Sequence, residues 1–255
     1  MGLWTPEHGR TLLPALAVMF ILAAVLRRWL GGKSMRMRII PLQIIAVLLV
    51  VLEIGKQAVS LSRGYDLYHL PFHFCSLFIF ALPVMAFYRG KHAAAVYDVV
   101  AAWCASLFLL MLIYPNLIYG AWDVQCFFKE YMCFHTVSFH NLVMLAAVLI
   151  PALRLQEQGC RNHRHVLAAT CVFCAVSATM AQLLKTNYAS FYSCNIPAFE
   201  TARIALQGTI GPVLTQMLYV LIVAVLTVLF VWMSYGILCA LQRLGTRGKQ
   251  QTAAF

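Results

Sequence analysis

The stretch Ile40-Pro-Leu-Gln-Ile-Ile-Ala-Val-Leu-Leu-Val-Val-Leu-Glu-Ile-Gly-Lys56 is mostly apolar, yet it carries a glutamate and a lysine near its end. Charged side chains within a membrane span are costly, so they are rare and usually face a protein interior or a wet cavity. Glu53 and Lys56 are three residues apart, so they share one face of a helix and can neutralise each other. The stretch predicts a membrane-crossing helix that faces a polar interior.

The composition extends this prediction to the whole chain of 255 residues, which is 62% hydrophobic and only 11% charged. Soluble proteins carry roughly 25% charged residues. Apolar runs near the ~20 residues that a membrane helix needs recur along the chain. We therefore expect an all-α polytopic membrane bundle of seven transmembrane helices. The expected spans are 11–30, 39–61, 70–88, 93–114, 134–153, 165–186 and 211–241.

The basic residues between these spans predict the orientation. Thirteen of the 19 lysines and arginines fall on the side that contains residues 27–38, and five fall on the opposite side. The side richer in lysine and arginine faces the cytoplasm. The N-terminus should then lie outside and the C-terminus in the cytoplasm of a cell-membrane protein. We divide the chain into an outer segment (1–10), a seven-helix membrane domain (11–244) and a cytoplasmic tail (245–255). The net charge of +11 is explained by this topology, and we expect no nucleic-acid partner.

Several reactive side chains are expected at a similar depth in the outer half of the bundle. With a rise of about 1.5 Å per residue, Cys75, Lys56 and His140 lie about 7–9 Å below the outer end and Glu53 about 12 Å. His73 and His135 lie just above them, and Lys185 lies at the outer end of the sixth span. The shared depth permits one polar pocket, although it does not fix how each helix is rotated.

A cysteine and a histidine in such a pocket form a possible nucleophile. An imidazole can take the thiol proton and leave a thiolate, which attacks an ester carbonyl to give an acyl-enzyme. His140 is the better partner for Cys75 by depth, with His135 as the alternative. These two histidines are five residues apart, about 140° around a helix, so they should face different partners.

The supporting roles and the competing interpretations follow from the same residues. Glu53 could orient a histidine, Lys56 or Lys185 could hold a lipid phosphate, and Asn187 could stabilise an oxyanion. Cys75 taken alone is more often a buried core thiol, and Lys185 could simply extend to the outer interface. A transporter with Glu53 and Lys56 as an intramembrane relay, or a non-catalytic scaffold, stays open. No metal cluster or cofactor motif is visible, so we expect neither a metal nor a cofactor.

The segment Leu70-Pro-Phe-His-Phe-Cys75 resembles the transmembrane protein 164 family of membrane acyltransferases, in particular its seven-helix bacterial relatives. Pro115 after the fourth span, His140 in the fifth, and Thr186-Asn187-Tyr188 after the sixth fit the same pattern. The resemblance covers nearly the whole membrane domain. It implies an acyltransferase that acts on membrane phospholipids through Cys75 and His140.

Overall fold

A computed structural model describes residues 4–156 and 161–252. Residues 1–3 and 253–255, at the ends of the predicted outer segment and tail, lie outside this description. In the described ranges the chain forms helices, turns and loops but no strand, which confirms the all-α prediction. The helices are α1 (Pro6–Leu30), α2 (Met35–Arg38), α3 (Ile40–Ser62), η1 (Leu67–His69), η2 (Cys75–Leu77), α4 (Phe78–Phe87), α5 (Ala93–Ile113), η3 (Pro115–Leu117), α6 (Ala121–Gln125), α7 (Tyr131–Ala152), α8 (His163–Leu184), η4 (Tyr188–Ser190), α9 (Pro197–Ile210) and α10 (Pro212–Thr252).

Six helical stretches of the described chain are long and apolar enough to cross a membrane. They correspond to six of the seven expected spans, so the chain is an integral membrane protein with several membrane helices. The stretches are Pro6–Leu30, Met35–Ser62, Ala93–Ile113, Tyr131–Ala152, His163–Leu184 and Pro212–Arg243.

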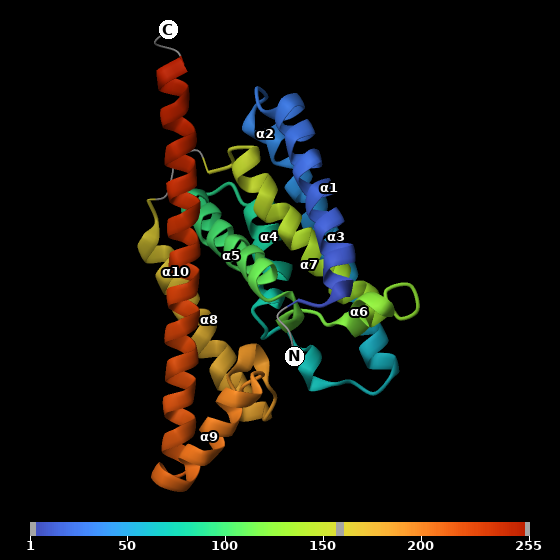
Figure 1. The fold of residues 1–255 in the computed structure, drawn as a ribbon. Coiled ribbons are helices and arrows are strands. Elements are labelled where there is room, and N and C mark those ends of the chain that lie inside the picture. Colours follow the sequence, from blue (N-terminus) through green and yellow to red (C-terminus); the bar gives the residue numbers. More distant parts are fainter. Residues whose placement is uncertain (1–3, 157–160, 253–255) are drawn as a thin grey trace.

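The bundle is arranged around α5 and α7. In each of these helices 56% of the most apolar stretch is buried, against 11% in α10. Helix α7 packs against α1, α3 and α5, while α10 packs against α5, α8 and α9 along one side of the molecule. Helix α1 begins toward the end from which α9 projects, and α10 extends to the opposite end (Figure 1).

The expected third span, 70–88, is wrong as a single helix. Residues 70–74 form turns and bends, Cys75–Leu77 form a 3-10 turn, and the α-helix begins only at Phe78. Pro71 disfavours a helical conformation in the residue before it, and Leu70 accordingly has φ −63° and ψ 148°. The apolar helix Cys75–Phe87 is about 20 Å long, short of the ~30 Å of a bilayer core.

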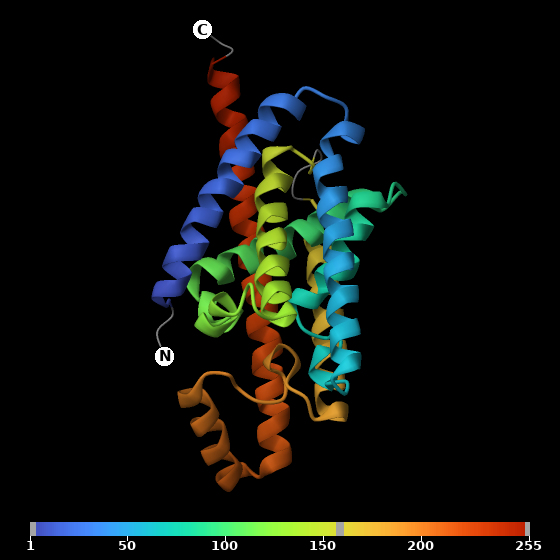
Figure 2. The same ribbon diagram turned by 90° about the vertical axis from the view of Figure 1, so that its right-hand side faces the viewer.

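Helix α9 was not predicted from the sequence. Pro197 occupies its first turn, and Gly211 ends it with φ +84°, a conformation in the left-handed region that favours glycine. The helix packs beside the first half of α10 and extends beyond the other helices (Figure 2). No residue of α9 is buried, so this part of the molecule stands apart from the core.

Candidate functional site

The stretch 67–74, which leads to Cys75, is held inside the protein by side chains from three other elements. Gln57 of α3 donates to the carbonyl of His69 (3.0 Å), and Ser177 of α8 donates to that of Phe72 (2.7 Å). The Tyr188 hydroxyl donates to the carbonyl of Leu67. Ser177 lies about 10 Å from the end of α8, which is a candidate membrane span. The irregular residues before α4 therefore pack about 10 Å along this span. Irregular backbone at that depth is tolerated only where protein or a water-filled cavity surrounds it.

The carboxylate of Glu53 is the centre of a buried polar cluster beside this segment. Its Oε1 lies 2.7 Å from Lys56 Nζ and accepts a 2.7 Å hydrogen bond from Gln57. Its Oε2 lies 3.3 Å from His135 Nε2, although the two atoms are not aligned for a hydrogen bond. The Glu53 and Lys56 side chains are only 10% and 12% exposed. The structure thus forms the Glu53–Lys56 pair that the spacing predicted and adds His135 to it.

The outer rim of the cluster contains residues that the sequence analysis did not single out. Tyr65 donates to the side-chain Oε1 of Gln57 (2.8 Å), and Ser60 Oγ lies 2.7 Å from His69 Nδ1. Burial lowers the pKa of His69 below its usual 6.5, which favours the neutral ring. These side chains are ordinary hydrogen-bonding residues, and only the fold of the segment after α3 brings them together.

Cys75 begins the 3-10 turn between the irregular segment and α4, and its side chain is half-buried. It lies within electrostatic reach of the Lys56 ammonium. In the described part of the chain, no hydrogen bond joins its thiol to His140 or His135. The helical rise used to estimate its depth does not apply here, because residues 70–74 are not helical.

His140 and His135 face different partners, as their separation along the helix predicts. Nδ1 of His140 lies 2.6 Å from the carbonyl of Thr136. A carbonyl only accepts hydrogen bonds, so Nδ1 carries the hydrogen and Nε2 keeps the lone pair that can accept a proton. The His140 ring is buried beside Tyr119 and within electrostatic reach of Lys56.

His73 and Tyr188 form an aromatic group at the edge of the cluster. The His73 ring lies 4.4 Å from that of Tyr68 and 5.3 Å from that of Tyr188, and its Nε2 is 3.1 Å from the Tyr68 carbonyl. Tyr188 is fully buried. His73 and Tyr188, which the sequence predicted as supporting residues, therefore lie side by side. His73 is part of the irregular segment, and Tyr188 holds the backbone just before it at Leu67.

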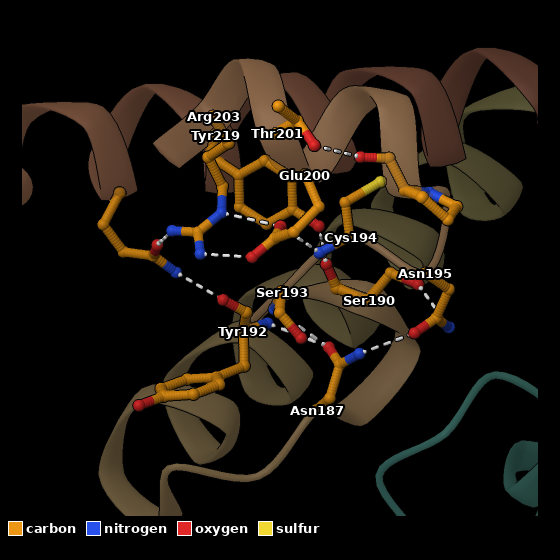
Figure 3. A network of polar contacts seen from close by, with 12 residues as sticks. Asn187, Ser190, Tyr192, Ser193, Cys194, Asn195, Glu200, Thr201, Arg203 and Tyr219 are labelled. Carbon is orange, nitrogen blue, oxygen red and sulfur yellow. Dashed lines mark hydrogen bonds and ion pairs between the residues drawn. The ribbon is translucent and has the colours of Figure 1, made fainter. Parts of the chain in front are cut away.

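Asn187 and Lys185 make their described contacts outside the Glu53 cluster. The Asn187 side chain accepts from the backbone N–H groups of Tyr192 (3.2 Å) and Ser193 (3.1 Å) and donates to Asn195 (2.9 Å), so it organises the loop before α9 (Figure 3). Lys185 caps α8 with φ +50° and is exposed. Among the described contacts, neither residue touches Glu53 or Cys75.

Neither a metal site nor a disulfide is assigned to the cysteines and histidines of this region. Residues 4–156 and 161–252 contain no group of three or more His, Cys, Asp or Glu side chains placed to hold a metal ion. Cys126, Cys133 and Cys194 are free thiols.

The site therefore combines three parts. They are the Cys75 thiol in the 3-10 turn after the irregular segment, the buried Glu53–Lys56 pair of α3, and two histidines, His135 and His140, of α7. No curated protein and no solved structure matches the chain. The model of the TMEM164 family matches residues 3–235, which includes the segment before Cys75, the Glu53 cluster and both histidines. Because this match covers nearly the whole chain, the protein belongs to the TMEM164 family.

Proposed function

We propose that this membrane protein transfers or hydrolyses acyl groups of membrane phospholipids, with Cys75 as the nucleophile and His140 as its base. One observation supports this most strongly: Cys75 directly follows an irregular segment that is held by α8, and it lies within electrostatic reach of Lys56 in the buried Glu53–Lys56 pair. Broken backbone and buried charges are both unfavourable in a membrane and mark functional sites. The resemblance of the Leu70–Cys75 segment to membrane acyltransferases supports the same residue.

In the proposed reaction Nε2 of His140 takes the Cys75 proton, and the thiolate attacks an ester carbonyl. A C–S bond forms, the ester C–O bond breaks, and the imidazolium returns the proton to the leaving lysolipid oxygen. A hydroxyl of an acceptor lipid, or water, then attacks the thioester while the imidazole takes the hydroxyl proton. The C–S bond breaks and the sulfur regains its proton, which completes acyl transfer or hydrolysis.

Lys56 and His135 have supporting roles in this proposal. The ammonium of Lys56 lies within electrostatic reach of Cys75, and a positive charge there opposes the effect of burial on the thiolate and could hold a lipid phosphate. Glu53 holds Lys56 in place and lies 3.3 Å from His135, which is the alternative base. Replacing the true base by alanine should slow the reaction about 10²–10⁴-fold.

The test uses purified protein in lipid nanodiscs with a fluorescent phospholipid and a lysolipid acceptor. Cys75→Ala should lose acyl transfer and hydrolysis while keeping its thermal unfolding transition, and the parent should accumulate a hydroxylamine-sensitive thioester on Cys75. Cys171→Ala is the matched control, because Cys171 is an exposed thiol on α8. Normal turnover by Cys75→Ala would contradict the proposal.

A second candidate function uses the same cluster as an ion or proton relay. The contacts of Glu53 with Lys56, Gln57 and His135 favour it, since a relay needs linked titratable groups inside the membrane. Asp98, on α5, is instead bonded to Gln156 and Asn162 of the loop that follows α7. Flux into proteoliposomes that requires Glu53 but not Cys75 would support the relay over the acyltransferase.

A further inference from the structure

A groove of about 570 Å³ lies between α4, α5 and α8. Its walls are almost entirely aliphatic or aromatic, and small residues leave the space: Ala81 on α4, Ala95 on α5, and Ala168 and Ala169 on α8. Two histidines, His92 and His165, lie at one end, where α5 and α8 begin. A ligand that fills the groove needs no hydrogen-bonding group along its length.

The length and position of the groove fit one lipid chain. On α5 its lining runs from the helix start at His92 to Trp103, about 16 Å along the axis. This is about half the ~30 Å hydrocarbon thickness of a bilayer. Helices α5 and α8 both belong to the candidate membrane spans.

The other end of the groove reaches the turn that carries Cys75. Leu77 lines the groove and belongs to the same 3-10 turn, Cys75–Leu77. Cys75 itself does not line the groove and lies two residues before Leu77. An acyl group bonded to the Cys75 sulfur would enter the groove past Leu77, and its chain would extend toward His92 and His165.

We propose that this groove, here called the chain groove, holds the acyl chain of the phospholipid whose ester reacts with Cys75. The inference rests on the proposed function and adds to it that the chain groove selects the acyl donor by chain length. Filling it should exclude long chains and still admit short ones, because one methylene more or less in a hydrophobic pocket is worth about 10–200-fold.

The experiment measures binding and reaction separately. The variant Ala169→Phe fills the chain groove, and Ala95→Leu narrows it from the opposite wall if the first variant does not fold. Ala175→Phe is the matched control, because Ala175 is exposed on the same helix and does not line the groove. The probe is a phosphatidylcholine with a diazirine near the methyl end of one chain, in nanodiscs, followed by peptide mapping.

We expect the probe to label α5 and α8 near His92 and His165 in the parent, in Cys75→Ala and in Ala175→Phe. Labelling should fall several-fold in Ala169→Phe. The ratio of turnover on long-chain to short-chain donors should fall at least tenfold in Ala169→Phe alone. Labelling that is equal in Ala169→Phe and Ala175→Phe would overturn the chain groove as a binding site.

The two proposals fail in different ways. Groove-specific labelling without any acyl transfer by the parent would contradict the proposed function and still support a lipid-binding groove. Acyl transfer that depends on Cys75, with the same chain-length preference in Ala169→Phe as in the parent, would support the function and overturn the inference.

Discussion

Glu53 has three polar neighbours in the described structure, whereas Lys56 forms its ion pair with Glu53. Glu53→Leu should therefore lower the free energy of unfolding by about 3 kcal/mol, because it leaves a buried ammonium without its carboxylate. Lys56→Leu should have a smaller effect, since the carboxylate keeps Gln57 and His135 as neighbours. Thermal unfolding in detergent measures both variants. A larger loss in Lys56→Leu would contradict the arrangement.

The residue scale also shows how far a sequence can predict a site. The Glu53–Lys56 pair follows from a spacing of three on a helix, which is a local property. The approach of His135 to Glu53 depends on how α3 and α7 are rotated against each other, and depth alone only permits it. Gln57, Ser60 and His69 have no unusual sequence pattern, because their contacts exist only once the chain after α3 folds back.

At the scale of elements, the break before α4 depends on hydrogen bonds from neighbouring helices. Ser177→Ala removes the hydroxyl that donates to the Phe72 carbonyl and leaves this carbonyl without that partner. We expect a loss of about 1–3 kcal/mol in the free energy of unfolding. Faster hydrogen exchange in residues 70–77 should accompany it.

The control for this variant is Ser234→Ala in α10. Ser234 is also buried, but its hydroxyl donates to Phe230, four residues earlier in its own helix, where the carbonyl already accepts the helical hydrogen bond. The loss in the free energy of unfolding should be much smaller in Ser234→Ala than in Ser177→Ala. Equal losses in the two variants would show that the Ser177 hydroxyl does not support the break.

Helix α9 is held to α10 and to the preceding loop by a separate charged group. Glu200 accepts two hydrogen bonds from Arg203 and one from the backbone of Cys194, and Arg203 also donates to Gln216 (Figure 3). The bonds from Arg203 lower the pKa of Glu200 below its ordinary 4.5. The resulting stabilisation is complete above about pH 4.5 and is lost as the pH falls through the lowered folded-state pKa.

Hydrogen exchange of residues 191–210 should thus increase as the pH is lowered below about 4.5, after correction for the intrinsic exchange rate. Glu200→Gln should show raised exchange already at pH 7 and little further change with acid. If the variant keeps the pH dependence of the parent, another group controls the docking of α9.

The contrast between long and short elements explains which parts of the fold were predictable. Apolar runs of about 20 residues identify the long helices, because a helix needs about this length to cross the hydrocarbon core. The break at residues 70–77 lies within such a run, so hydropathy alone hides it. Pro71 does not reveal the break by itself, because a proline is equally compatible with the first turn of a helix. Helix α9 has 14 residues, fewer than a membrane span needs, so a search for apolar runs of about 20 residues does not find it.

At the scale of the whole molecule, the number of crossings depends on α4, which is too short by itself to span a bilayer core. The asymmetry of lysine and arginine, thirteen against five, predicts that the chain between Arg63 and Lys91 does cross, with Arg63 outside.

Arg63 and Lys91 are both exposed and flank this part of the chain, so they form a matched pair for labelling. With a membrane-impermeant maleimide, Arg63→Cys should be labelled in intact cells and Lys91→Cys only after permeabilisation. The label is counted against the parent protein, because native thiols such as Cys171 are exposed. Labelling of both variants from the same side would mean that α4 and its irregular segment re-enter without crossing. The opposite pattern would reverse the orientation, and Cys75 would then be reached from the cytoplasmic side.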